Sequence, residues 1–279
     1  LMSLDGTCLD VPDTPANEAE FGRPGSSRRE GGGAFPQLRL VALSEAGTHA
    51  ITDAALGPCS TGENALADEL LGALQEGMLC LADRGFYSFE RFQKARQSGA
   101  HLLWRVKSDV GLPREQTLSD GSYLTSIYAL KDRKARREGQ PARVVEYGLD
   151  DPARGEPDQR YRLITTLLDP DSAPANELAA LYAERWEIEG ALDELKTHQR
   201  GPRVVLRSKA PDGVYQEAYG HLATHYAIRR VMHDAALTAD LDPDRLSFIR
   251  TLRAARRSAR TQPGFSPPHD QQRPSPSHH

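Results

Sequence analysis

The stretch LYAERWEIEGALDELK, residues 181–196, is the most informative part of this 279-residue sequence. It contains Tyr182, Arg185, Glu189 and Lys196 in the spacing Y-x2-R-x3-E-x6-K. At about 100° per residue, one α-helix would bring these four side chains within an arc of roughly 60°. Charged helical faces are usually solvated, and pairs four residues apart are common. Here, however, a carboxylate, a phenol and two cations share one stripe, which suits the binding of a metal ion and a phosphate group.

Two aspartates upstream lie in settings that predict strands. Asp5 belongs to LMSLDGTCLDVP (residues 1–12), whose apolar positions favour a strand at the start of the sequence. Asp83 follows Met78–Ala82, a short apolar run typical of a buried strand, and precedes a turn that contains glycine. An isolated aspartate before a glycine-containing turn is most often a plain turn residue. The order and spacing of all three acids therefore carry the interpretation, because carboxylates at strand ends can hold a cation outside a sheet.

Asp10 and Asp13 are alternatives to Asp5, since all three lie near the same predicted strand. Asp10 is an odd number of residues from Asp5, so it would face the opposite side of an uninterrupted strand. The sequence context favours Asp5, and Asp10 is the second choice.

The segments around the aspartates predict alternating strands and helices. A polar link, Ser44–Gly47, joins two strands in a hairpin, and Ser60 with Glu63 forms a capping-box signal for a helix. Ser88 is the expected N-cap of a second helix that stops at Gly99. The expected elements are strands at 36–43, 48–56, 78–82 and 101–106, a helix from about 63 to 75, and a helix from about 89 to 98.

With an acid on the first strand and another after the fourth, this order resembles the ribonuclease H-like fold. The DGT context of Asp5, the ADRGF context of Asp83 and the YREK pattern around Glu189 resemble the insertion-sequence-four group of bacterial DDE transposases. The similarity runs from about Leu1 to Ala236. It implies an α/β fold with a mixed sheet flanked by helices and a β-rich insertion before the last catalytic helix.

The resemblance implies that Asp5, Asp83 and Glu189 are the catalytic and metal-binding acids. In two-metal phosphoryl transfer, a pair of divalent cations about 4 Å apart activates the attacking oxygen and stabilises the leaving one. Mg²⁺, or Mn²⁺ in its place, prefers carboxylate oxygens and water. We expect Asp5 to bridge both ions, and Asp83 and Glu189 each to hold one.

The expected DNA contacts surround these acids. Arg185 and Lys196 would bind phosphates beside the cleaved bond, Arg185 through its bidentate fork. Tyr182 and Arg84 are further candidates for phosphate contact. Trp186 is the better of the two tryptophans for stacking on a displaced base, while Trp104 is at least as well explained as a buried anchor.

The sequence predicts four parts: a first part of the ribonuclease H-like core at 1–107, the β-rich insertion at 108–170, a second part of the core at 171–240, and a basic segment with a disordered tail at 241–279. Residues 200–262 hold 12 lysines and arginines against 6 acids, although the whole chain has a net charge of -4. A basic region is compatible with binding to DNA phosphates. The basic stretch KDRKARREGQPAR (residues 131–143) is expected at a hairpin tip.

The composition favours a soluble protein of the bacterial cytoplasm. Three cysteines lack metal-ligand spacing, and no apolar run is long enough to cross a membrane. Members of the resembling group carry a DNA-binding region before the first catalytic strand, whereas here that strand begins at Leu1. We therefore expect a shortened protein or a fragment.

Three functions remain open. The first is a transposase catalytic domain that cuts element ends and joins the freed 3′-hydroxyl to target DNA, acting on double-stranded DNA as a homodimer. The second is an inactive remnant that only binds DNA. The third is a ribonuclease H-like nuclease without strand transfer, which the YREK spacing disfavours.

Overall fold

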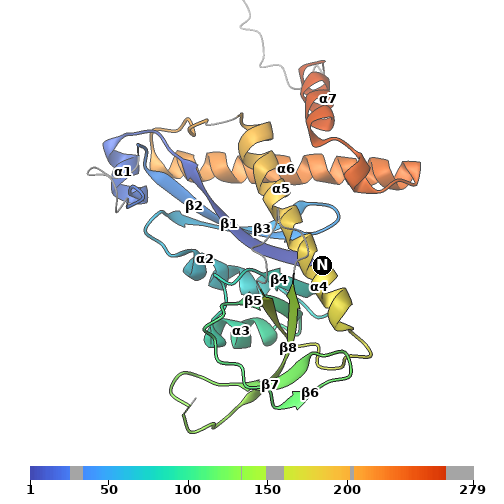
Figure 1. The fold of residues 1–279 in the computed structure, drawn as a ribbon. Helices are drawn as coiled ribbons and strands as arrows, with labels where there is room; N and C mark the ends of the chain where they lie inside the picture. The colour runs from blue at the N-terminus through green and yellow to red at the C-terminus, as the bar shows by residue number, and fades with distance from the viewer. Residues whose placement is uncertain (26–33, 133, 149–159, 202–203, 262–279) are drawn as a thin grey trace, which may run out of the picture.

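The structure is a computed structural model that describes residues 1–25, 34–132, 134–148, 160–201 and 204–261. Within these residues, nine strands form one sheet in the order β3-β2-β1-β4-β5-β9-β8-β7-β6 (Figure 1). The predicted disordered tail falls in 262–279, which lies outside the described residues. The three cysteines are free.

The first five strands are β1 (Met2–Asp10), β2 (Gln37–Glu45), β3 (Ala50–Pro58), β4 (Leu79–Ala82) and β5 (His101–Val106). β1, β4 and β5 run parallel, whereas β2 and β3 are antiparallel to their neighbours. This arrangement is the ribonuclease H-like sheet that the sequence predicted. The hairpin link lies two residues later than expected, because Gly47 and His49 supply the positive φ angles of the turn.

Helices cover both faces of the sheet (Figure 1). α2 (Glu63–Leu70), followed by the 3₁₀ turn η1 (Leu71–Ala73), packs on one face together with α3 (Phe89–Arg96). α4 (Ala175–Ala183), α5 (Glu187–Asp193) and the long α6 (Pro211–Ala239) pack on the other.

Two short elements lie outside these groups: α1 (Pro15–Phe21) and the 3₁₀ turn η4 (Pro243–Arg245).

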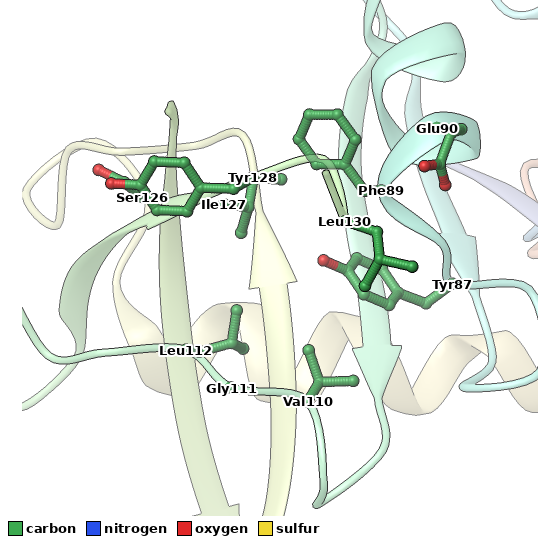
Figure 2. A pocket seen from close by; sticks show the side chains of 10 residues that line it. All are labelled: Tyr87, Phe89, Glu90, Val110, Gly111, Leu112, Ser126, Ile127, Tyr128 and Leu130. Carbon is green, nitrogen blue, oxygen red and sulfur yellow. The ribbon is translucent and has the colours of Figure 1, made fainter. Parts of the chain in front are cut away.

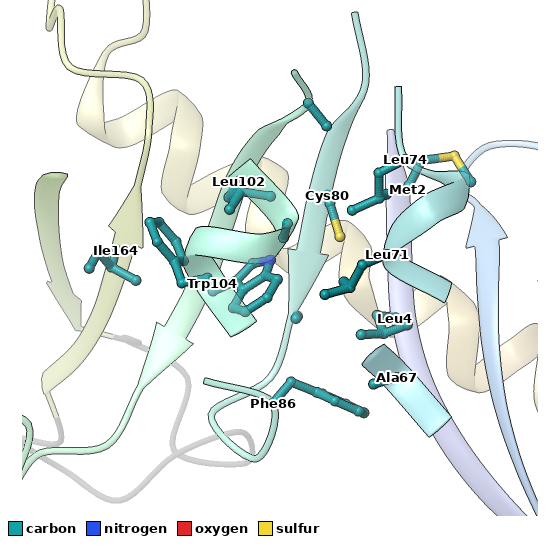
Figure 3. Packing of buried hydrophobic residues seen from close by; sticks show 14 of the residues in the cluster. Met2, Leu4, Ala67, Leu71, Leu74, Cys80, Phe86, Leu102, Trp104 and Ile164 are labelled. Carbon is teal, nitrogen blue, oxygen red and sulfur yellow. The ribbon is translucent and has the colours of Figure 1, made fainter. Parts of the chain in front are cut away.

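The largest core cluster lies between the sheet and helices α2 and α3. Trp104 is fully buried there and meets the ring of Phe92 edge to face, with centroids 5.4 Å apart. Figure 3 shows Trp104 beside Leu102 and Ile164, with Leu4 and Leu71 further along the same layer. Trp104 is thus a packing anchor rather than a surface for stacking a base.

The expected capping box at Ser60 is wrong. The N-cap of α2 is Gly62, which makes no side-chain cap hydrogen bond, and Glu63 is the first residue of the helix. Glu63 is therefore not in the third helical position from which a capping-box glutamate reaches back. Ser88, by contrast, caps α3 as predicted, because its hydroxyl accepts a hydrogen bond from the amide of Arg91.

The predicted β-rich insertion contains β6 (Gln116–Thr117), β7 (Tyr123–Ile127), β8 (Gln140–Gly148) and β9 (Arg160–Thr165). β9 pairs antiparallel with β5, so these strands extend the sheet of β1 to β5 and share its hydrogen bonding. Of the basic stretch, residues 131, 132 and 134–139 lie at the tip between β7 and β8, as expected, whereas residues 140–143 belong to β8. The division of the chain at residues 107, 170 and 240 remains a prediction.

The YREK segment, residues 181–196, is helical but less regular than predicted. A 3₁₀ turn, η2 (Glu184–Trp186), joins α4 to α5, and a π-helical turn, η3 (Glu194–Gln199), follows α5. π turns often occur at functional sites, because they redirect side chains locally. The long helix α6 follows this segment, and α7 (Phe248–Thr261) is a helix that the sequence analysis did not predict.

Candidate active site

Asp5 and Asp83 lie side by side where β4 ends. β1 and β4 pair from Met2 with Cys80 to Leu4 with Ala82; Asp5 is the next residue of β1, and Asp83 directly follows β4. Beyond this point β1 continues to Asp10, and in the described part of the chain β2 is the strand that pairs with it, while the amide of Leu206 donates a hydrogen bond to the carbonyl oxygen of Asp10. Ends of parallel strands are where α/β sheets bind ligands.

Arg185 lies between the first and third predicted acids. Its Nη1 atom is 3.7 Å from Oδ2 of Asp5, and its Nη2 atom is 3.7 Å from Oε1 of Glu189. The Arg185 side chain is only 7% exposed, and its Nε atom has no hydrogen-bond partner in the described part of the chain. The YREK segment thus brings Glu189 close to the middle of β1, where Asp5 lies.

Asp83 is contacted from two sides. The buried Tyr182 places its hydroxyl 3.4 Å from the carbonyl oxygen of Ala82 and 3.5 Å from Oδ1 of Asp83. Arg105, from β5, has its Nη1 atom 3.6 Å from the same Asp83 oxygen. Tyr182 therefore contacts the end of β4 rather than solvent, and its predicted contact with a phosphate remains untested.

Lys196 completes the alignment of the YREK segment along β1. Its Nζ atom lies 2.9 Å from Oγ1 of Thr7 and donates a hydrogen bond to it. Thr7 is two residues from Asp5, so both side chains project from the same face of the strand. The predicted stripe is thus real despite the irregular helix, because each of its four side chains meets β1, β4 or another member of the stripe.

The pKa values of Asp5 and Glu189 are both raised. Burial raises the pKa of Asp5, and the negative charge of Asp83 raises it further. The hydrogen bond from the Gly6 amide and the positive charge of Arg185 each lower it by less than burial raises it. Burial also raises the pKa of Glu189, with further contributions from Asp5 and Asp83. A cation at this position would relieve the repulsion, and carboxylate oxygens are the donors that hard divalent cations prefer. The residues therefore fit a divalent-metal site.

Arg84 and Trp186, the other predicted DNA contacts, are on the surface. Arg84 is exposed in the turn after Asp83, and Trp186 is 58% exposed. The guanidinium of Arg185 lies 4.8 Å from the centre of the Trp186 ring, a cation–π distance. Trp186 thus has an open ring beside the carboxylates.

Asp10 and Asp13, the alternatives to Asp5, each bind a side chain outside the site. The Asp10 carboxylate accepts a hydrogen bond of 2.8 Å from Gln37, and Asp13 forms an ion pair with Arg23. The structure brings neither of them to Asp83.

Three residues near the carboxylates were not among the predicted site residues: Thr7, Glu63 and Arg105. Thr7 belongs to the quoted DGT context, and an alternating strand would have placed it on the face of Asp5. Arg105 and Glu63 come close only through sheet order and helix packing, for which the sequence offers no local signal.

A second acidic cluster is formed by His49, Glu187 and Asp244, whose ligand atoms all lie within 4.8 Å of one another. Among the described residues, this is the group of three possible metal ligands whose ligand atoms lie within 4.8 Å of one another. The carboxylates of the predicted triad lie further apart, around Arg185. Arg229 Nη2 lies 2.9 Å from Nδ1 of His49. Because arginine only donates, Nδ1 must accept, and the proton on Nε2 faces the two carboxylates. This cluster therefore suits an ion network better than a metal.

A cavity of about 200 Å³ lies away from the carboxylates, beside α3 and the strand β7 (Figure 2). Its lining is mostly apolar and includes Tyr87, Phe89 and Leu130, with Glu90 as the one carboxylate. It offers no set of groups for phosphoryl transfer.

The predicted basic region forms part of an ordered surface. α7 packs Phe248 and Leu252 against Ile228 and Met232 of α6. α7 has no acidic residue. Its five arginines are all exposed: Arg250, Arg253, Arg256, Arg257 and Arg260. No helix in the described ranges has the length and apolarity needed to cross a membrane.

Comparisons with known proteins agree with this geometry. The family model described as "Transposase DDE domain" matches residues 1–226. The transposase InsG for insertion sequence element IS4 of Escherichia coli K12 is 29% identical over 270 residues, covering 96% of this chain and 60% of InsG. The putative transposase InsZ of the same organism is 30% identical over 104 residues, covering 37% of this chain and 34% of InsZ.

Among solved structures, the fold is similar to a cryo-EM structure of the piggyBac transposase synaptic complex with hairpin DNA. The TM-score is 0.56 at 11% identity, over 94% of this chain and 54% of that one. The chain thus spans about 60% of InsG and a smaller share of the other two proteins. The family model, which covers most of the chain, shows that this protein belongs to the DDE transposase domain family.

Proposed function

We propose that this chain is the catalytic part of a transposase that cuts DNA at element ends and joins the freed 3′-hydroxyl to target DNA. The observation that carries the proposal is the position of Arg185 between Asp5 and Glu189. Asp83 lies beside Asp5, because it directly follows β4, the parallel neighbour of β1. Three carboxylates from separate segments converge there, which is the donor set of a two-metal phosphoryl transferase.

Asp5, Asp83 and Glu189 would hold two Mg²⁺ ions, or Mn²⁺ in their place. When bound, the cations supply activation of the attacking oxygen and stabilisation of the leaving one. Arg185 would turn from the carboxylates towards a phosphate, since both anions suit its fork.

The remaining groups would position DNA. Lys196 and Arg84 supply positive charge for phosphates, and Trp186 supplies an exposed ring for a displaced base. Tyr182 would orient Asp83 and present its hydroxyl to a phosphate. We propose double-stranded DNA as the substrate, bound by a homodimer in the bacterial cytoplasm.

The test is Mg²⁺- or Mn²⁺-dependent nicking and strand transfer on labelled element-end DNA. Glu189→Gln, Asp5→Asn and Asp83→Asn should each abolish both reactions, whereas the matched controls Glu187→Gln and Asp10→Asn should retain them. Activity that survives all three triad substitutions would refute the proposal.

Two further outcomes separate the other functions. DNA binding with metal binding but no turnover would identify a remnant that only binds DNA. Nicking without joining of pre-cut ends would identify a ribonuclease H-like nuclease. Light scattering with and without element-end DNA would test the homodimer, for which a doubled protein mass on DNA is expected.

A further inference from the structure

A fourth carboxylate, that of Glu63, approaches the site from the opposite face of the sheet. Glu63 is the first residue of α2, which packs on the face of β1 that carries Met2 and Leu4. Gly6 belongs to this face, because side chains alternate along a strand. A Cβ atom at Gly6 would lie 2.1 Å from Oε1 of Glu63. The Glu63 carboxylate therefore occupies the space that any larger residue at position 6 would fill.

The two faces meet at the free edge of β1. β4 pairs with β1 only as far as Leu4, so among the described residues no strand separates the faces next to Asp5 and Gly6. Asp5 turns towards this edge, since its Oδ1 atom accepts a 2.8 Å hydrogen bond from the amide of Gly6. The carboxylates of Asp5 and Glu63 thus flank the same backbone unit.

The charges around Glu63 agree with this position. Burial raises its pKa, and the charges of Asp5 and Asp83 raise it further against the effect of Arg39. No ion pair joins Glu63 to Arg39 within 4.0 Å among the described residues, and the Nε atom of Arg39 has no hydrogen-bond partner there. A glutamate in the first turn of a helix is also favoured by the helix dipole. That effect alone does not explain why the side chain lies over Gly6 rather than in solvent.

We infer that Glu63 is a fourth carboxylate of the active site, which helps to hold a divalent cation beside Asp5, and that Gly6 is required because it leaves room for this carboxylate. The inference rests on the proposed function. It assigns a role in cation binding to a residue outside the predicted triad, and it explains the glycine of the DGT sequence by a close approach.

The first experiment measures Mn²⁺ binding to the full chain by calorimetry, together with the Mg²⁺ concentration that gives half-maximal nicking. Glu63→Gln should weaken Mn²⁺ binding and raise the required Mg²⁺ by about tenfold or more, as is typical for residues that support metal ligands. Glu63→Asp should recover part of the loss. DNA affinity without metal should be unchanged, because no phosphate-binding residue is altered.

A second experiment tests the role of Gly6. Gly6→Ala should reproduce the metal defect of Glu63→Gln, because the new methyl group displaces the carboxylate. Adding Gly6→Ala to Glu63→Gln should cause little further loss. The control is Gly57→Ala on β3, where the new Cβ would approach Leu66 at 3.1 Å, away from the carboxylates.

Unchanged Mn²⁺ affinity in Glu63→Gln, with equal losses of thermal stability in Glu63→Gln and Arg39→Gln, would overturn the inference and make Glu63 a structural partner of Arg39. Failure of the proposed function looks different. In that case Mn²⁺ binding would be insensitive to Asp5→Asn as well, and the wild-type chain would not nick DNA.

Discussion

Lys196 donates a hydrogen bond of 2.9 Å to Thr7, and this contact links the last residue of the YREK segment to the strand that carries Asp5. Together with the approach of Arg185 to Asp5 and of Tyr182 to Asp83, it aligns the segment along the middle of β1 and the end of β4. The three acids therefore come together through contacts made by the cationic and phenolic members of the same stripe.

Substitution of Lys196 and of Thr7 should have different effects. Lys196→Gln removes one positive charge, so the slope of log affinity against log salt for duplex DNA should fall by about 0.9. Thr7→Val keeps that charge and removes only the hydrogen bond, so the slope should stay unchanged while nicking falls by the equivalent of about 1 kcal/mol. Equal slopes in both variants and the wild type would show that Lys196 binds no phosphate.

The two tryptophans should separate binding from stability. Trp186→Ala should weaken binding to single-stranded DNA by about 1–3 kcal/mol without changing the melting temperature, because the ring is exposed. Trp104→Ala should lower the free energy of unfolding by about 3–5 kcal/mol, because the ring is fully buried against Phe92. Filter binding and urea unfolding measure the two effects. A stability loss confined to Trp186→Ala would contradict this assignment.

Arg143 should be a main support of the insertion. Its side chain is fully buried, pairs with Asp120, and donates to the carbonyl oxygen of Ala173 at 2.7 Å and to Ser122 at 2.8 Å. Arg143→Met leaves these acceptors unpaired, so the free energy of unfolding should fall by about 3–5 kcal/mol in urea denaturation.

The matched control for Arg143 is Arg114, which forms an exposed ion pair with Glu146 at 3.3 Å. Arg114→Met should cost less than about 1 kcal/mol. Equal costs for the two substitutions would show that burial of Arg143 is unimportant.

The exposed arginines of α7 should contribute to DNA binding. Replacing Arg250, Arg253, Arg257 and Arg260 with glutamine should reduce the salt slope by up to roughly 0.9 for each DNA phosphate that is no longer neutralised. Arg256 is kept, because it donates to the carbonyl oxygen of Gln199. The control is Arg230→Gln on α6, whose charge is already paired with Asp234 at 3.2 Å. An unchanged slope in the fourfold variant would exclude α7 from the DNA interface.

Sequence patterns predicted the parts of this site that depend on local periodicity. The apolar residues around Asp5 placed it on a strand, and the apolar run before Asp83 located the end of β4. The spacing of the YREK segment put Glu189 on the stripe that faces these aspartates, and the structure agrees in spite of the π turn.

The contacts that depend on tertiary packing could not be predicted in this way. The spacing of Ser60 and Glu63 predicted a capping box, but α2 begins at Glu63 itself. The Glu63 side chain instead lies over Gly6. The extension of the sheet through β9 also has no local signal, because strand order is set by long-range pairing.

The most direct test of the central claim is to map the bound cation on the chain. Fe²⁺ is substituted into the site, and ascorbate with peroxide generates radicals that cut the backbone near the ion. The account predicts cuts near Asp5, Asp83 and Glu189 that disappear with excess Mg²⁺ and in Asp5→Asn. Cuts near His49 and Asp244 instead, unaffected by Asp5→Asn, would contradict it and assign the metal to the other acidic cluster.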